Sequence, residues 1–164
     1  MNVNQALKVL KEASPGLGRN EYLFLLAQSK AETNWGRGWS GCMAGSHNWG
    51  ATQGKPGCLI SDTNEKGETF RAYYQRFPSD VEGARKFARL SILGKNKYRK
   101  YARKMAKQGK FADASYALRH PHGGSYYTLH PAKYSQKVEE IANQLARELG
   151  WKFKPQGKPQ HFEP

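Results

Sequence analysis

Glu32 is the side chain of this sequence whose type and position point most directly to chemistry. The stretch 20–36 has a helical apolar period that runs through Tyr22 and Ser29, and the next position on that face is Glu32. A carboxylate there is desolvated and lies near the negative end of the helix dipole, and both effects disfavour its charge. A carboxylic acid that keeps its proton near neutral pH can act as a general acid. The alternative is a solvated glutamate, or one paired with Arg37, at a helix end.

Two segments of this region, 32–38 (ETNWGRG) and 47–53 (HNWGATQ), resemble the lysozyme-like peptidoglycan hydrolases. In that superfamily a catalytic glutamate closes a buried helix, and a strand containing Asn, Gly and Gln follows across the sugar cleft. The chain is similar above all to phage lysins and to the N-acetylglucosaminidases of the autolysin and flagellar-rod type, from about residue 20 to about residue 149. The resemblance implies that Glu32 protonates a glycosidic oxygen.

The resemblance also implies residues that would bind the sugar. Asn48 and Gln53 match polar positions that hold N-acetyl sugars, and Tyr126 matches a tyrosine that reaches the cleft. Trp35, Trp39 and Trp49 could stack on sugar rings. The alternatives are ordinary strand or turn hydrogen bonding for the two amides and core packing for each of the tryptophans.

A second carboxylate could assist Glu32, because a glycosidase must also meet the positive charge that develops on the sugar. The stretch 61–69 offers Asp62 and Glu65 as counterparts of an acidic residue that the related glucosaminidases carry on their β-lobe, and the resemblance does not choose between them. For each of the two, an exposed hairpin charge is the alternative. A lytic transglycosylase needs no second carboxylate, so both product types stay open.

The elements that must position these residues are mostly helical. Apolar periodicity and end signals predict helices at 4–12, 20–36, 79–94, 96–108, 111–118 and 134–149. Asn20 and Ser79 are expected to cap the starts of two of these helices, and Gly150 to end the last, whose inward apolar face begins at Tyr134. Short strands are expected at 48–53, 59–63 and 69–77. The fold class is therefore α+β and mostly α, and the resemblance implies a lysozyme-like fold with a helical lobe and a small β-hairpin lobe. Residues 1–150 would form one catalytic domain, and residues 151–164 a C-terminal tail that is a partly ordered strap.

The chain is strongly basic, with 27 Lys and Arg against 13 Asp and Glu and a formal net charge of +14. Much of this charge lies in the predicted helix 96–108. Such a surface attracts polyanions, either nucleic acid or an anionic cell-wall or outer-membrane polymer. Because no recognised nucleic-acid motif accompanies the charge, we expect peptidoglycan strands and anionic polymer as partners, no nucleic acid, and a monomer.

Two cysteines, Cys42 and Cys58, flank the expected strand 48–53. A disulfide between them would close a loop of about 15 residues and stabilise the fold by about 3 kcal/mol in the entropic account. Reduced thiols are equally compatible with synthesis in a cytoplasm. The cysteines with His47 fit no zinc-finger spacing and have no obvious fourth ligand. The histidines at 120, 122 and 130 resemble a metal cluster, but the prolines and the glycine pair among them favour a mobile loop, so we expect no metal and no cofactor.

Residues 1–5 lack the basic and apolar regions of a signal peptide, and no apolar run reaches membrane-spanning length. We therefore expect synthesis in a host cytoplasm and action on the cell wall after release by a holin or carriage on a virion. Together these features predict a phage endolysin or virion-associated lysin that cleaves the β-1,4 bond between N-acetylglucosamine and N-acetylmuramic acid. The rival interpretations are a lytic transglycosylase, a basic nucleic-acid-binding protein and an inactive wall-binding module.

Overall fold

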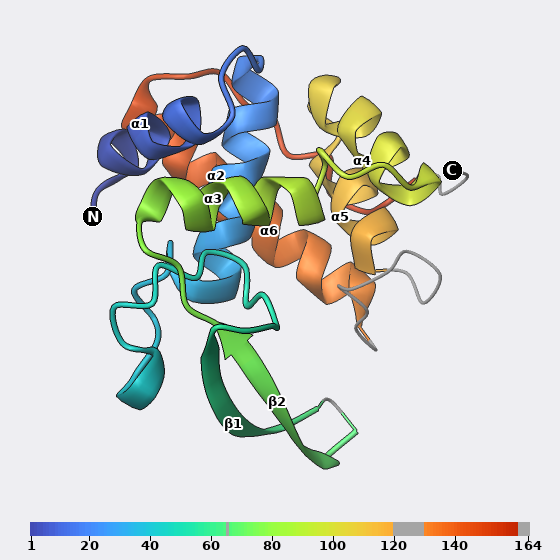
Figure 1. Cartoon of the computed structure of the whole chain (residues 1–164). Helices are drawn as coiled ribbons and strands as arrows, with labels where there is room; N and C mark the ends of the chain where they lie inside the picture. The colour runs from blue at the N-terminus through green and yellow to red at the C-terminus, as the bar shows by residue number, and fades with distance from the viewer. Residues whose placement is uncertain (65, 120–129, 161–164) are drawn as a thin grey trace.

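The computed structural model describes residues 1–64, 66–119 and 130–160, and in this part of the chain six helices form one lobe from which a two-stranded hairpin projects (Figure 1). The elements in chain order are α1 (Val3–Ala13), α2 (Arg19–Thr33), the 3-10 turn η1 (Gly41–Met43), β1 (Gly57–Thr63), β2 (Thr69–Gln75), α3 (Asp80–Leu90), α4 (Lys97–Lys107), α5 (Phe111–Arg119) and α6 (Pro131–Leu149). This arrangement confirms the expected α+β, mostly α fold class with a small hairpin lobe.

The central helix of the lobe is α2. Its residues are buried without a break from Glu21 to Ser29, because α1, α4 and α6 all pack against it. The sequence predicts a single inward stripe, but Leu23 and Phe24, outside that stripe, are also enclosed. A helix that is apolar on all sides is buried on all sides. Glu32 lies just beyond this enclosed section, where α2 reaches the hairpin end of the lobe.

The start of α2 differs from the predicted one, because Asn20 is not its N-cap. Gly18 takes that position, and its N–H donates a hydrogen bond to Glu21 Oε1 over 3.1 Å. Asn20 instead donates from Nδ2 to the carbonyl of Lys107 over 3.0 Å, which ties α2 to the end of α4. At the other end Asn34 adopts the left-handed conformation that commonly ends a helix.

The other helices follow their predicted ranges within a few residues. Ser79 Oγ accepts a hydrogen bond from the N–H of Glu82 at the start of α3, and Gly150 ends α6 in the left-handed conformation. Local signals suffice at these points, because each satisfies backbone groups that a helix end leaves unpaired. Among the described helices none is both long enough and apolar enough to cross a bilayer.

The hairpin lobe has an antiparallel pair of strands and a small core of its own. β1 and β2 pair over their full length, which confirms two of the three predicted strands. The buried core of this lobe consists of Met43, Cys58 and Tyr74. Cys42 and Cys58 form a disulfide, so the bonded alternative is the one that the fold adopts. The bond joins β1 to η1.

The predicted strand 48–53 is wrong, because this segment is a loop. Only Gln53 makes an isolated bridge, to β2. Asn48 Oδ1 accepts hydrogen bonds from the N–H groups of Gly50 (3.3 Å) and Thr52 (2.9 Å), so the chain turns around this side chain. Asparagine side chains that bond to nearby backbone in this way compete with strand pairing.

Candidate active site

Three helix ends meet at Glu32. This residue lies in the last turn of α2, and its side chain is 14% exposed. Arg119, the last residue of α5, forms an ion pair with Glu32 Oε1. Tyr134, in the first turn of α6, donates a hydrogen bond from its hydroxyl to the same oxygen over 2.9 Å. The carboxylate is thus held by partners from two other helices.

The two partners of Glu32 also hold each other. The guanidinium carbon of Arg119 lies 3.8 Å from the ring centroid of Tyr134, which is a cation–π contact. A further cation, Lys137 of α6, donates from Nζ to the carbonyl of Ala31 over 3.4 Å. Cations at this end of α2 compensate the partial negative charge of the helix dipole.

The ion pair with Arg119 opposes the expectation from the sequence that the charged form of Glu32 is disfavoured. A guanidinium in contact with a carboxylate favours the ionised form, whereas the burial and helix dipole considered in the sequence act in the opposite direction. The other alternative suggested by the sequence, a pair between Glu32 and Arg37, does not occur, because Arg37 binds Asp80.

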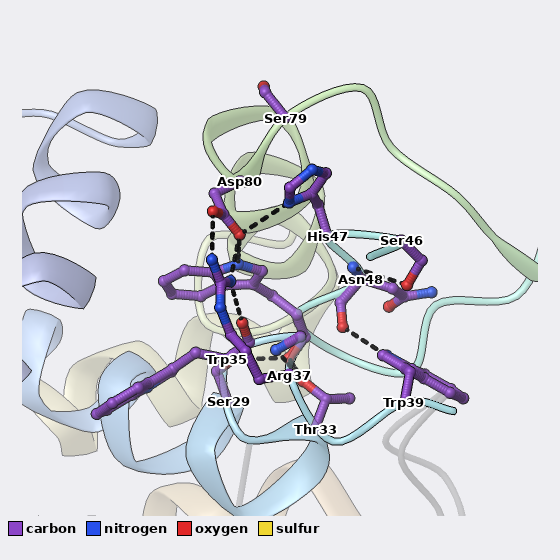
Figure 2. Close-up of polar contacts among 12 residues, drawn as sticks. Ser29, Thr33, Trp35, Arg37, Trp39, Ser46, His47, Asn48, Ser79 and Asp80 are labelled. Carbon is purple, nitrogen blue, oxygen red and sulfur yellow. Dashed lines mark hydrogen bonds and ion pairs between the residues drawn. The ribbon is translucent and has the colours of Figure 1, made fainter. Parts of the chain in front are cut away.

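Asp80, the first residue of α3, gathers the loop that follows α2 (Figure 2). Arg37 donates two hydrogen bonds to its carboxylate, over 2.5 and 2.7 Å, and Trp49 Nε1 donates to Oδ1 over 3.0 Å. His47 Nδ1 lies 3.2 Å from the same oxygen. Burial by itself would raise the pKa of Asp80, but these partners, with Arg37 foremost, lower it to about 2. Charge-assisted bonds of this kind anchor the loop to α3.

The same loop is fastened to α2 close to Glu32. Ser29 Oγ and Thr33 Oγ1 donate hydrogen bonds to the carbonyl of Trp49, over 2.7 and 2.9 Å. The indole N–H of Trp35 donates to the carbonyl of Leu26 over 2.9 Å. The last turns of α2 are therefore crosslinked to the loop that leads into the hairpin, as Figure 2 shows for Ser29 and Thr33.

Three of the predicted sugar-binding residues are buried. Trp35 is 2% exposed, and Trp49 and Asn48 are fully enclosed. Both Nδ2 hydrogens of Asn48 are used inside the protein, by the carbonyls of Thr52 (2.9 Å) and Gln75 (2.8 Å). These positions match the alternatives of core packing and turn hydrogen bonding. The three residues support the site from within and do not present their side chains at its surface.

The other predicted site residues that the structure describes, Gln53 and Asp62, meet at Tyr74 of the hairpin. The Tyr74 hydroxyl donates to Asp62 Oδ2 over 3.4 Å and also hydrogen-bonds to Gln53. Burial raises the pKa of Tyr74, the Gln53 bond opposes this, and the charge of Asp62 adds to it. Across the described residues, no hydrogen bond or ion pair links this group to Glu32. The two carboxylates are held by separate networks.

The indole of Trp39 is partly accessible and lies next to Tyr74 of the hairpin. Trp39 is half-buried, its Nε1 donates to the carbonyl of Asn48 over 2.9 Å, and its ring centroid lies 5.5 Å from that of Tyr74. Of the tryptophans between α2 and β1 it is the one that keeps part of its surface open. It is therefore a better candidate for a sugar-stacking surface than Trp35 or Trp49.

Two predicted site residues, Glu65 and Tyr126, lie outside the described residues, as do the histidines at 120 and 122. Within the described ranges, no group of three or more His, Cys, Asp or Glu side chains could hold a metal ion. Cys42 and Cys58 are bonded to each other and so are not available as thiolate ligands.

The sequence does not identify Arg119 and Tyr134 as neighbours of Glu32. It places Tyr134 correctly on the inward face of the last helix, where the hydroxyl on an otherwise apolar stripe was the available signal. Arg119 offered none, because basic residues are common at helix C-termini. As a chemical unit, a half-buried carboxyl group flanked by a phenol and a guanidinium can exchange a proton with a ligand at its open edge.

Comparison with known proteins gives one informative structural similarity. The fold is similar to a crystal structure of the catalytic domain of the autolysin Auto from Listeria monocytogenes, with a TM-score of 0.53 and 18% sequence identity. The match covers 90% of this chain and 80% of that one. No family model matches the chain, and no curated protein does. At this level of identity the likeness establishes the fold alone.

Proposed function

We propose that this chain is a peptidoglycan hydrolase that cleaves the β-1,4 bond between N-acetylglucosamine and N-acetylmuramic acid. The observation that carries the proposal is Glu32, a half-buried carboxylate at the end of the central helix, contacted by Arg119 and Tyr134. The fold is one that an autolysin catalytic domain also has, which supports a cell-wall substrate. Peptidoglycan glycan strands are the substrate that follows.

In the proposed reaction the carboxyl group of Glu32 gives its proton to the glycosidic oxygen as the bond from that oxygen to the anomeric carbon breaks. For this step the Arg119 guanidinium has to move off the carboxyl group when the glycan enters, while the Tyr134 hydroxyl keeps that group oriented. Arg119 then pairs with the carboxylate that the reaction leaves behind and stabilises it. The positive charge that develops at the anomeric carbon is met by water or by the N-acetyl group of the substrate itself. The proton that the attacking water loses passes to a base, and exchange with solvent then returns a proton to Glu32.

A hairpin carboxylate is the proposed base for that water. Asp62 is the candidate that the structure describes, and Glu65 is its sequence neighbour. Asp62 is exposed and shares no hydrogen bond with the Glu32 group in the described part of the chain, an observation that favours a second candidate function, that of a lytic transglycosylase. In that reaction the substrate's own 6-hydroxyl attacks the anomeric carbon, and no water is consumed.

The deciding experiment is digestion of purified sacculi followed by mass spectrometry of the soluble products. Reducing-end sugars, together with a large loss of rate in Asp62→Asn or Glu65→Gln, would support hydrolysis with a hairpin base. Products ending in 1,6-anhydro sugars, with both substitutions silent, would replace the hydrolase by a transglycosylase. Binding to sacculi without any soluble product would leave only a wall-binding module.

A basic face on α4 is proposed to dock the enzyme on anionic cell-wall or outer-membrane polymer. The helix carries no acidic residue, and Lys97, Lys100 and Lys104 are exposed, whereas Arg103 is paired with the buried Glu21 over 2.7 Å. Raising salt from 0.1 to 1 M shortens the screening length from about 10 to about 3 Å. Lysis of whole sacculi should therefore fall steeply with salt, whereas cleavage of a short neutral glycan should not.

Replacing those three lysines by glutamine should flatten the salt dependence and leave cleavage of the soluble glycan unchanged. Equal salt sensitivity on both substrates would contradict a docking role for α4. Tight, salt-sensitive DNA binding with no lytic activity would favour the nucleic-acid-binding protein instead.

A further inference from the structure

The chain beyond α6 returns across the helical lobe as a strap, here residues 151–160 (Figure 1). The ring of Phe153 packs on Phe111 of α5 with ring centroids 4.7 Å apart. The guanidinium of Arg19, at the start of α2, lies 5.5 Å from the ring centroid of Trp151. The strap is thus seated on several helices and is part of the folded lobe.

Two buried carboxylates specify the path of the strap. Glu139 of α6 accepts hydrogen bonds from the N–H groups of Gln156 (2.6 Å) and Gly157 (2.8 Å). Asp113 of α5 accepts from Gln156 Nε2 (2.7 Å) and from the N–H of Gln160 (2.9 Å). Both acids are nearly inaccessible, at 3% and 2% exposure. Since four donors of the strap converge on them, its position beside α5 and α6 is fixed.

The strap and the helices enclose a groove of about 790 Å³. This volume is within the range of about 300–1,000 Å³ typical of small-ligand sites. Tyr116 of α5, with Pro155 and Pro159 of the strap, supplies much of the apolar lining, and the amide of Gln136 adds a polar group. Glu139 also borders the groove, but its two oxygens are occupied by the strap.

The charge on the rim of the groove is positive. Lys133 of α6 and Lys158 of the strap both line it, and both are exposed. Within the described chain neither ammonium group forms an ion pair. The acid in the lining, Glu139, is occupied by the strap, and Glu140 beside it accepts a hydrogen bond from Gln136 Nε2 over 3.2 Å. A ligand that complements these walls has carboxylates to meet the lysines, amides to bond the glutamine, and small aliphatic groups to cover the proline and tyrosine rings.

The groove shares its helices with the candidate active site. Lys133 immediately precedes Tyr134, whose hydroxyl bonds to Glu32, and Tyr116 lies one turn before Arg119, whose guanidinium pairs with Glu32. A ligand in the groove would therefore lie against the same end of α5 and the same first turn of α6 that hold the proton donor.

We propose that the groove binds a short acidic peptide, and that this peptide is the stem attached to the glycan that Glu32 cleaves. The second part rests on the proposed function. A strand stripped by an amidase keeps only the carboxylate that each N-acetylmuramic acid carries, and it lacks the further carboxylates, amides and aliphatic groups that would fill the groove. The groove therefore distinguishes peptide-bearing glycan from stripped glycan. The strap then contributes to substrate selection, which Asp113 and Glu139 make possible by holding it in place.

The test compares glycan strands that carry stem peptides with the same strands after an amidase has removed the peptides. The variant is Lys133→Gln/Lys158→Gln in the full chain, and the matched control is Lys8→Gln/Lys11→Gln, two exposed lysines of α1. Two rim ion pairs should contribute a factor of roughly 5 to 10. We expect kcat/KM of the groove variant to fall by that factor on peptide-bearing strands and to be unchanged on stripped strands, with the control equal to the unmodified protein on both.

Calorimetry with a synthetic acidic tetrapeptide tests the binding independently of catalysis. The unmodified protein should bind the free-carboxylate peptide several-fold more tightly than its amidated form, and the groove variant should lose that preference. Equal losses on both glycans, or a tetrapeptide affinity that does not depend on the two lysines, would overturn the groove proposal. If the protein cleaves neither glycan yet the tetrapeptide preference holds, the proposed function fails and the peptide site stands.

Discussion

The helical lobe and the hairpin lobe are stabilised in different ways. The helical lobe has one continuous core built around α2, to which α1, α3, α4, α5 and α6 contribute. Among the described residues, the buried hydrophobic core of the hairpin lobe consists of Met43, Cys58 and Tyr74, and the lobe adds the disulfide between Cys42 and Cys58. A two-stranded hairpin is marginal on its own, so a covalent link and the loop anchored at Asp80 supply what its core cannot.

The carboxylates of the two lobes differ accordingly. Glu32 is 14% exposed and has partners on two further helices, whereas Asp62 is exposed and its side chain is bonded to Tyr74 over a long 3.4 Å. The helical lobe therefore holds its acid in a defined geometry, and the hairpin leaves its acid solvated. Substitutions in the two lobes should have effects that differ in size and in kind.

The largest expected effect is on activity, from Glu32→Gln. General acid catalysis contributes roughly 10²–10⁴-fold, so lysis should fall by that factor, while the melting temperature stays near that of the unmodified protein because the amide keeps an acceptor for Tyr134. Glu68→Gln, which changes an exposed hairpin carboxylate, is the matched control and should be silent. Rates come from turbidity loss of sacculi. Retention of more than a tenth of the activity would exclude Glu32 as the proton donor.

The next largest effect concerns the strap of the helical lobe. A chain that ends at Gly150 loses the rings of Trp151 and Phe153, each contributing about 1.5–3 kcal/mol when buried, and leaves Asp113 and Glu139 without their donors. Its free energy of unfolding, measured in urea, should fall by about 3 kcal/mol or more. Phe153→Leu, which keeps an apolar contact with Phe111, should lose much less. An unchanged urea midpoint in the shortened chain would show that the strap is dispensable.

Removal of the disulfide should act on the hairpin lobe alone. Loss of a cross-link that closes a loop of about 15 residues costs about 3 kcal/mol in the entropic account. The loss in the free energy of global unfolding is smaller if the lobe without its disulfide opens locally while the helices stay folded. In Cys42→Ser/Cys58→Ser, amide hydrogen exchange should rise in β1 and β2 and stay unchanged in α2 and α6. Mild reduction of the unmodified protein should reproduce the pattern. Faster exchange throughout the helices would show that the two lobes unfold together.

The smallest effect is the pH dependence of the anchor between the lobes. The pKa of Asp80 is lowered to about 2 in the folded protein from an ordinary value of 3.8, so its ionised form contributes stability above pH 4 that is lost as pH falls toward 2. The shift corresponds to roughly 2 kcal/mol. Asp80→Asn should be less stable by about this amount at pH 7, and the difference should close between about pH 4 and pH 2.

The pKa of Glu139, in the helical lobe, is shifted in the opposite direction to that of Asp80. Burial raises its pKa above the ordinary 4.5, and the bonds from the strap reduce that shift without reversing it. Its ionisation therefore opposes folding, and the stability difference between Glu139→Gln and the unmodified protein should not close on acidification as the Asp80→Asn difference does. Parallel pH curves for the two variants, measured by thermal unfolding, would contradict the assignment of the anchor to Asp80.

Sequence signals for helix ends and turns gave correct predictions where the residue concerned hydrogen-bonds backbone groups of its own stretch of chain. The Ser79 cap, the stop at Gly150 and the two strands of the hairpin all appear as predicted, because capping and turn formation depend on neighbours a few residues away. The strand predicted at 48–53 failed for a related reason. The side chain of Asn48 captures two backbone N–H groups of its own loop, and the alternation of residue types gives no sign of this.

Residue types alone were enough to predict the class of fold, the helix that ends near Glu32 and the basic surface of α4, since periodicity and charge need no knowledge of distant contacts. The surroundings of that glutamate depend instead on how the helices pack. Arg119 and Tyr134 reach it from α5 and α6, Arg37 turns to Asp80, and the strap settles on two buried acids. For each of these contacts the sequence offers several cations or donors of the same type. The packing of the core brings particular helix ends together and so determines which one makes the contact.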